Sequence, residues 1–170
     1  LDAGQGTVTH LEGRHKNKWR PVPLATVELQ KRASRYPRIG SETLMTTAEE
    51  LYQQGLISSP RTETEKFRPE FGHQPLIQQF ANLGGGGDGV GAYASKLLTN
   101  NNFQLPRAGQ HDDQAHPTIT PCKAVDPNSI GDQRQRSVYT LIVKHYLACC
   151  SRDAVGRETL LTVRMASEDF

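Results

Sequence analysis

An amphipathic helix that ends in a glycine and a proline-stiffened loop constrains this chain more than any other feature. Residues 41–54 place their apolar side chains at helical spacing, so that these form one stripe. The stripe consists of Leu44, Ala48, Leu51 and Tyr52. Ser41 can cap the start of this helix, Glu42 suits its first turn, and Gly55 suits the position just past its end. The sequence therefore predicts a helix that stops abruptly at a loop.

That loop, residues 55–64, reads Gly-Leu-Ile-Ser-Ser-Pro-Arg-Thr-Glu-Thr. Pro60 fixes the backbone immediately before Arg61. The guanidinium of Arg61 stays charged and can donate two parallel hydrogen bonds to an anion. An arginine and several hydroxyls on a stiff loop are suited to a phosphate whose negative charge grows during a reaction. Glu63 either orients Arg61 or a base, or simply lies at the surface.

Two outer segments are expected to be strands, because residues 6–12 and 159–165 carry strand-like apolar and β-branched residues. We expect them to pair and to enclose a helical insertion. Thr26 is a candidate helix cap. The insertion is expected to hold further helices at 26–36, 74–82, 90–98 and 127–151, and a long loop at 100–121. Residues 26–54 fit either a helix-turn-helix unit or an ordinary pair of helices.

The last predicted helix has one apolar face. Its members are Val138, Leu141, Ile142, His145 and Cys149. We expect Cys149 to be buried in the core rather than reactive. The three cysteines, an odd number without C-x-x-C spacing, argue against a disulfide framework and a structural zinc site and favour a reducing compartment.

Composition excludes several classes of protein. The chain has 170 residues, of which 35% are hydrophobic, and no apolar run approaches the roughly 20 residues of a membrane span. Gly84, Gly86 and Gly89 match G-x-G-x-x-G only in letters, because no strand precedes them, so a dinucleotide site is not expected. The polar composition and the start at Leu1 without a methionine suggest an internal fragment of a longer protein.

Positive charge gathers at the start of the chain. Residues 1–38 contain eight lysines and arginines against three acids, so this stretch carries +5 although the whole chain carries only +2. A local basic field suits docking of a polyanion, and it equally suits an ordinary solvated face. Lys18 and Arg20 flank Trp19, a mixture typical of contacts with single-stranded DNA, although Trp19 itself is expected to pack into the β-rich part.

The loop resembles the active-site loop of the type IA DNA topoisomerases, which reads Ser-Tyr-Pro-Arg-Thr-Glu-Thr. The likeness extends over most of the chain and is greatest to the eukaryotic topoisomerase III alpha branch. It is carried by Lys18-Trp19-Arg20-Pro21, Thr26-Val27-Glu28-Leu29-Gln30, Ala33-Ser34-Arg35, residues 51–64, Ala115-His116-Pro117 and residues 145–151. The resemblance implies a mainly α fold with flanking β structure. In it, a helical active-site domain (25–153) is inserted between strands of a β hinge domain (1–24 and 154–170).

The family cleaves one DNA strand, holds its 5′ end as a phosphotyrosine, passes another strand and reseals without ATP. In this chain Ser59 occupies the position of the tyrosine nucleophile. A serine hydroxyl is far less acidic than a phenol and reaches several ångströms less far, so neither Ser58 nor Ser59 can simply substitute. We therefore expect the chain to be unable to cleave DNA, and a catalytically inactive DNA-binding remnant is the alternative reading.

A second departure lies in residues 111–121, where the family reads Ala-His-Pro-Pro-Ile-His-Pro. His116 matches its first histidine, which lies near the scissile phosphate, whereas Thr118 replaces a proline and Thr120 replaces the second histidine. Taken without the family, His111, Asp112, Asp113 and His116 could instead form a metal cluster, the basis of a metal-dependent hydrolase.

The resemblance implies roles for eight positions. Ser59, Arg61 and His116 would form the catalytic set, and the DNA-binding set would be Thr62, Glu63, Lys18, Arg20 and Arg35. It also implies Mg²⁺ held in a toprim domain outside this chain, with no metal bound by the chain itself. The implied partners are single-stranded DNA, a RecQ-type helicase and an OB-fold cofactor, with no membrane, and the implied location is the nucleus.

Overall fold

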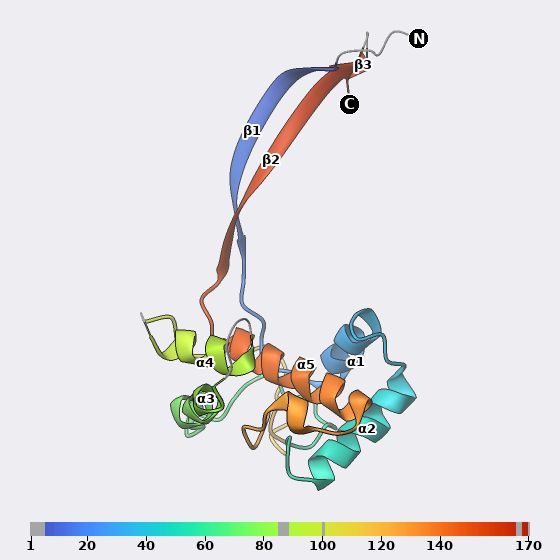
Figure 1. The fold of residues 1–170 in the computed structure, drawn as a ribbon, viewed down its shortest axis with the longest axis vertical. Coiled ribbons are helices and arrows are strands. Elements are labelled where there is room, and N and C mark those ends of the chain that lie inside the picture. Colours follow the sequence, from blue (N-terminus) through green and yellow to red (C-terminus); the bar gives the residue numbers. More distant parts are fainter. Residues whose placement is uncertain (1–5, 85–88, 100, 166–167, 170) are drawn as a thin grey trace. The chain divides into compact units, whose positions relative to one another are not determined.

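The computed structural model describes residues 6–84, 89–99, 101–165 and 168–169. The chain folds into two compact units. One is helical and comprises Arg20–Arg152, and the other combines the segment up to Trp19 with the segment from Asp153 onward. A helical insertion between two paired strands is therefore confirmed (Figure 1). The assignment of residues 1–24 and 154–170 to a hinge domain stays a prediction.

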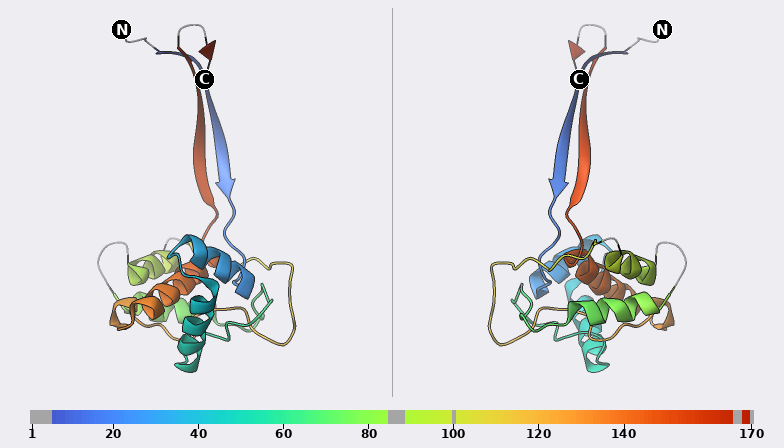
Figure 2. Two further views of the ribbon diagram at one scale, coloured as in Figure 1. Left: turned by 90° about the vertical axis from the view of Figure 1, so that its right-hand side faces the viewer. Right: turned by 90° about the vertical axis from the view of Figure 1, so that its left-hand side faces the viewer.

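The β unit is built on one antiparallel pair, β1 (Gly6–Lys18) and β2 (Ala154–Met165), with a short β3 (Glu168–Asp169) beside β2. Both views of Figure 2 show β1 and β2 running side by side. The register joins Gly6 to Met165 at one end and Lys18 to Ala154 at the other. The pairing of the two predicted strands is thus confirmed.

Both strands are longer than the sequence predicted. The prediction that the first strand ends at residue 12 is wrong, because β1 continues through the basic residues Arg14 and Lys16 to Lys18. Lys16 Nζ lies 2.7 Å from Glu158 Oε1 on β2, and such a cross-strand ion pair is compatible with continued pairing. The expected packing of Trp19 is also wrong, since 66% of this residue is exposed.

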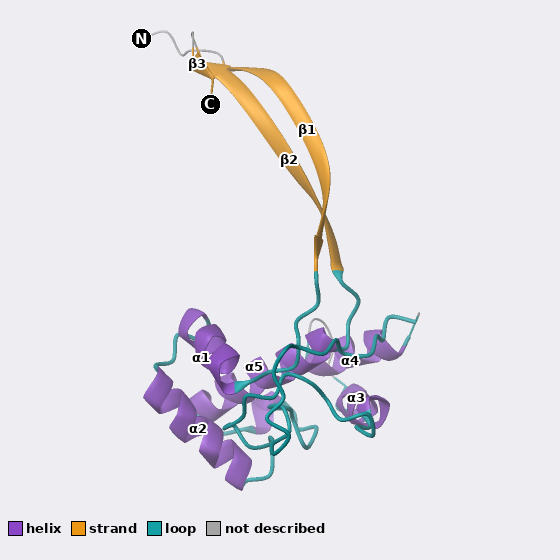
Figure 3. Ribbon diagram, turned by 180° about the vertical axis from the view of Figure 1, so that it is seen from behind, coloured by secondary structure: helices purple, strands orange, loops and turns teal. Residues whose placement is uncertain are grey.

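The helical unit surrounds a core centred on its last helix. Its helices are α1 (Thr26–Arg35), α2 (Ser41–Gln53), α3 (His73–Asn82), α4 (Val90–Leu98) and α5 (Gln133–Cys149), with a 3₁₀ turn, η1 (Pro127–Ser129). α5 packs against α1, α2 and α4, and α3 packs on α4. Figure 3 shows the long loops, in teal, that connect these helices. The loop expected at 100–121 forms no helix or strand within its described residues.

The abrupt end of α2 is confirmed. Gly55 has a φ of 67°, the left-handed conformation that glycine adopts without a steric penalty. Gly55 N–H donates to the Tyr52 carbonyl at 2.8 Å, and Leu56 N–H donates to the Leu51 carbonyl at 3.0 Å. This pair of hydrogen bonds is a Schellman motif, which turns the chain sharply into the loop.

The start of α2 differs from the prediction. Gly40, not Ser41, occupies the capping position, and Ser41 Oγ instead accepts a hydrogen bond from Gln30 Nε2 of α1 at 2.8 Å. The bond ties the two helices together. Whether α1 and α2 act as a helix-turn-helix unit stays a prediction.

The helix expected at 127–151 is interrupted. Asp126 caps η1 by accepting from Asn128 N–H at 2.9 Å, and Asp132 caps α5 by accepting from Gln135 N–H at 2.8 Å. Two caps so close together start two separate helical segments. The predicted apolar face of α5 holds, and Cys149 is buried as expected.

The remaining expectations concern the glycine motif, membrane-spanning helices and the three cysteines. Gly86, the middle glycine of the G-x-G-x-x-G letters, lies outside the described residues. None of the helices in the described ranges has both the length and the apolar character needed to cross a membrane. Cys122, Cys149 and Cys150 are free thiols.

Candidate functional site

Residues 58–64, which follow the turn after α2 and are here named the signature loop, are held against the start of α1. Thr26 Oγ1 donates to the Pro60 carbonyl at 2.7 Å and accepts from Thr62 N–H at 2.9 Å. Thr26 N–H donates to the Thr62 carbonyl at 3.0 Å. Thr26 was predicted as the helix cap, but Ala25 takes that position, which leaves the threonine hydroxyl to hold the loop.

The start of the signature loop is fixed by Ser58. This residue is buried, and its Oγ donates to the Thr118 carbonyl at 2.8 Å and accepts from Thr120 N–H at 2.9 Å. The Ser58 N–H donates to the Thr120 carbonyl at 2.9 Å. Isolated bridges between Ile57 and Pro121 and between Leu24 and Ile119 extend this contact. Residues 118–121 therefore hold both the start of the signature loop and the segment around Leu24.

We expect Ser58→Ala to lower the free energy of unfolding by about 2 kcal/mol, because the Thr120 N–H and the Thr118 carbonyl would each lose a buried partner. Urea unfolding of the 170-residue chain measures this. Ser59→Ala is the matched control, since Ser59 is only half-buried and its Oγ makes one long contact, 3.4 Å from Arg61 N. We expect that control to change stability by less than about 0.5 kcal/mol. Equal losses in the two variants would contradict the role given to Ser58.

The end of the signature loop is joined to residues 111–117 by Asp113, through its carboxylate and through its backbone N–H, which donates to Thr64 Oγ1 at 3.1 Å. Asp113 accepts from Thr64 Oγ1 at 3.0 Å, from the backbone N–H of Ala115 at 2.9 Å and from that of His116 at 2.8 Å. Its second oxygen lies 3.1 Å from His116 Nδ1. Asp113 therefore fixes both the backbone of this loop and the ring of His116.

These donors also fix the charge of Asp113. The backbone N–H of His116 is the main cause that holds the pKa of Asp113 well below its ordinary value, and the donors of Ala115 and Thr64 act in the same direction. The neighbouring Asp112 also has a lowered pKa, chiefly because Lys66 donates to it. Both carboxylates are thus ionised at neutral pH.

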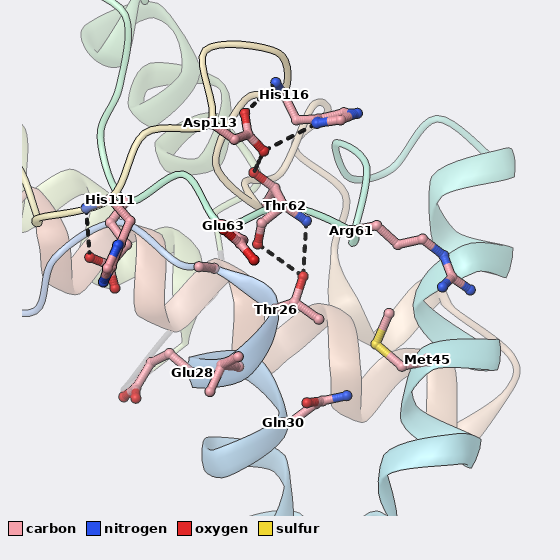
Figure 4. A pocket seen from close by; sticks show the side chains of 13 residues that line it. Thr26, Glu28, Gln30, Met45, Arg61, Thr62, Glu63, His111, Asp113 and His116 are labelled. Carbon is pink, nitrogen blue, oxygen red and sulfur yellow. Dashed lines mark hydrogen bonds and ion pairs between the residues drawn. The ribbon is translucent and has the colours of Figure 1, made fainter.

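The two loops border a pocket of about 880 Å³ together with α1 and α2. The pocket lining brings together residues from four separate segments, as Figure 4 shows. They include Thr26, Glu28 and Gln30 of α1, Met45 of α2, Arg61, Thr62 and Glu63 of the signature loop, and His111, Asp113 and His116. Two of the predicted catalytic residues, Arg61 and His116, therefore line one pocket.

The third predicted catalytic position does not line this pocket. Ser59 is half-buried, and its Oγ lies 3.4 Å from the backbone N of Arg61. Arg61 extends along the pocket edge towards α2, and its Nε lies 2.6 Å from Glu49 Oε1. Glu63 is exposed, and Arg61 pairs with Glu49 rather than with Glu63.

The remaining predicted DNA-binding residues lie elsewhere. Lys18 and Trp19 border a separate pocket of about 630 Å³ within the β unit. Arg20 belongs to the helical unit and donates to the Leu105 carbonyl at 3.2 Å. Arg35 is exposed in the last turn of α1 and does not line the pocket of Figure 4.

Sequence reasoning missed the organising roles of Asp113 and Glu49. The sequence indicated Asp113 only as a metal ligand, although an aspartate can accept hydrogen bonds from backbone N–H groups two and three residues further along the chain, here those of Ala115 and His116. Glu49 carried no signal, because an acid on an exposed helix face is usually solvated. Within the described ranges, no group of three or more His, Cys, Asp or Glu residues is placed to hold a metal ion.

Comparison with known proteins points to one family. A family model described as DNA topoisomerase matches residues 1–170. DNA topoisomerase 3 of Saccharomyces cerevisiae is 40% identical over 173 residues, which cover 96% of this chain and 26% of the yeast protein. DNA topoisomerase 3-alpha of Drosophila melanogaster is 44% identical, and the match covers 91% of this chain and 12% of the fly protein. DNA topoisomerase 3-alpha of Homo sapiens is 43% identical, and the match covers 96% of this chain and 16% of the human protein.

A solved structure agrees on the fold. Full-length topoisomerase I from Thermotoga maritima superposes with a TM-score of 0.65 at 19% identity, covering 97% of this chain and 26% of that one. The chain thus spans about a quarter or less of the relatives described. The family model over all 170 residues and these identities show that the chain belongs to the type IA DNA topoisomerases.

Proposed function

We propose that this chain supplies the helical DNA-contacting part of an enzyme that cleaves, passes and reseals single DNA strands, and that its pocket receives a backbone phosphate. The observation that carries the proposal is the convergence of Arg61 and His116 on one pocket from two different loops. These are cationic or proton-donating groups, which a phosphate requires, and hydrogen bonds made by Thr26 and Asp113 fix the loops that carry them.

In this proposal each side chain has one task. Arg61 would donate to the phosphate oxygens and offset the charge that grows as phosphorus becomes five-coordinate. His116 is held through Nδ1 by Asp113, so the opposite nitrogen, Nε2, would donate to a phosphate oxygen when the ring is protonated. Thr62 and Glu63 would contact the bound DNA strand beside this phosphate. Lys18, Arg20 and Arg35 would add contacts outside the pocket.

We further propose that the chain cannot cleave DNA while Ser59 stands at the nucleophile position. The serine hydroxyl lies against its own loop, 3.4 Å from the backbone N of Arg61, and Ser59 is not among the residues that line the pocket. An aliphatic hydroxyl without a dedicated base is also a poor nucleophile and a poor leaving group. The chain would then bind DNA without forming the covalent link.

The remaining components of the activity would come from outside this chain. Mg²⁺ would be held by acidic residues of another domain, where it would help to position the phosphate. A RecQ-type helicase and an OB-fold protein would be partners of the whole protein, and the nucleus its location. These proposals rest on the family resemblance.

Salt dependence tests the binding step. If the chain contacts two to four phosphates of an oligothymidylate, the slope of log K against log salt should be roughly −1.4 to −2.8. Affinity should therefore fall roughly 7- to 50-fold between 50 and 200 mM salt, measured by fluorescence anisotropy. Arg61→Gln should reduce the slope by about 0.7, because one phosphate contact is lost. Binding that does not respond to salt would contradict the proposed phosphate contacts.

A further inference from the structure

Arg61 forms an ion pair with a carboxylate of the neighbouring helix α2. Its Nε lies 2.6 Å from Oε1 of Glu49, which stands on α2 twelve residues earlier. The Arg61 side chain is 71% exposed, whereas the Glu49 side chain is 29% exposed. Figure 4 shows Arg61 extending towards α2 and away from Asp113 and His116.

The geometry of a guanidinium makes this pair relevant to DNA binding. A phosphate is bound most specifically by two parallel donors of one edge of the group. Glu49 already occupies Nε. A phosphate can take the edge that includes Nε only if the carboxylate leaves, and a carboxylate that stayed beside the phosphate would repel it.

We propose that Glu49 is an exchange partner for Arg61, which occupies the guanidinium until a DNA phosphate displaces it. The proposal rests on the proposed function, because it assigns a DNA phosphate to Arg61. In the resting state the pair holds Arg61 along α2. When DNA binds, the Arg61 guanidinium moves from carboxylate to phosphate and Glu49 is released to solvent. Glu49 therefore lowers DNA affinity and is a positioning residue rather than a catalytic one.

A purely structural role for the Glu49–Arg61 pair would have the opposite effect on DNA affinity. If Glu49 only supported the signature loop, its neutralisation would loosen Arg61 and weaken DNA binding. If Glu49 competes with phosphate, its neutralisation tightens binding. An exposed ion pair shifts an equilibrium by only a small factor, so the expected gain is roughly two- to fivefold.

The experiment compares the 170-residue chain with Glu49→Gln, using a fluorescein-labelled oligothymidylate at low salt. We expect the variant to bind roughly two- to fivefold more tightly. Glu50→Gln is the matched control, because it removes the same charge from the same helix at an exposed residue whose partner is Gln135 Nε2, at 2.9 Å. In an Arg61→Gln background, Glu49→Gln should have no effect beyond that of Glu50→Gln.

The ¹⁵N shift of Arg61 Nε gives an independent readout. It should change when Glu49 is replaced by glutamine, and it should change again when oligothymidylate is added. A Glu49→Gln chain that binds DNA no more tightly than Glu50→Gln, or more weakly than the unaltered chain, overturns the exchange proposal. Failure of the unaltered chain to bind single-stranded DNA at all would contradict the proposed function itself, and the exchange with it.

Discussion

Replacing Ser59 by tyrosine is expected to create covalent DNA cleavage in a protein that otherwise lacks it. The test protein is a chimera in which this chain replaces the matching 26% of yeast DNA topoisomerase 3. With serine at position 59, we expect no covalent adduct after denaturation on labelled single-stranded DNA. With tyrosine we expect a clear adduct, a difference of at least about 10⁴-fold, because removing a nucleophile has effects of that size.

The physical reason is acidity and reach together. A phenol ionises near pH ~10, whereas an aliphatic alcohol is far less acidic and leaves a phosphorus centre slowly. The Ser59 hydroxyl also lies against the backbone of its own loop. Binding of single-stranded DNA and the circular dichroism spectrum serve as controls that both chimeras fold. An adduct of equal yield in the Ser59 chimera would show that our account of the chemistry is wrong.

Acidification from pH 7 to pH 4 is expected to lower the free energy of unfolding by about 3 kcal/mol through His145. This residue of α5 is buried, its Nε2 donates to the Val22 carbonyl at 2.8 Å, and its Nδ1 has no hydrogen-bond partner among the described residues. Burial lowers the pKa of His145 from 6.5 to about 4. A proton on Nδ1 would be a buried donor without an acceptor.

The direction of the effect follows from proton uptake. Between pH 6.5 and pH 4 the unfolded chain holds a proton on His145 and the folded chain does not, so stability falls as pH drops through this window. Each pKa unit corresponds to roughly 1.4 kcal/mol. The contribution of His145 becomes constant only well below pH 4, where the folded chain is also fully protonated at this residue. His73, whose pKa burial also lowers, adds to the loss in the same direction.

Urea unfolding at intervals between pH 7 and pH 4 measures this dependence. His145→Gln is the control, because an amide can still donate to the Val22 carbonyl and does not titrate. The free energy of unfolding of this variant at pH 7 will differ from that of the unaltered chain. The amount by which this free energy falls between pH 7 and pH 4 should be about 3 kcal/mol smaller in the variant than in the unaltered chain. An unchanged pH dependence in this variant would exclude His145 as the cause.

Local patterns predicted most elements of the fold well. The stripe from Leu44 to Tyr52 and the glycine at 55 predicted α2 and its abrupt end, because helical spacing and a left-handed backbone are properties of neighbouring residues. Predictions failed where distant residues decided the outcome. Lys16 pairs with Glu158 in the part of β1 beyond residue 12, where the sequence predicted no strand, and Thr26 uses its hydroxyl on the signature loop rather than on its own helix.

The candidate site shows the same division. The family resemblance, the arginine on a stiff loop and the serine at the nucleophile position could all be identified from the sequence, since each is a matter of residue identity and order. The contacts of Asp113 with His116 and of Glu49 with Arg61 became visible only in the folded chain. The Glu49–Arg61 pair joins a helix to a loop twelve residues later, and both pairs depend on particular side-chain conformations. Their energy depends on distance and burial, which no local pattern of residues records.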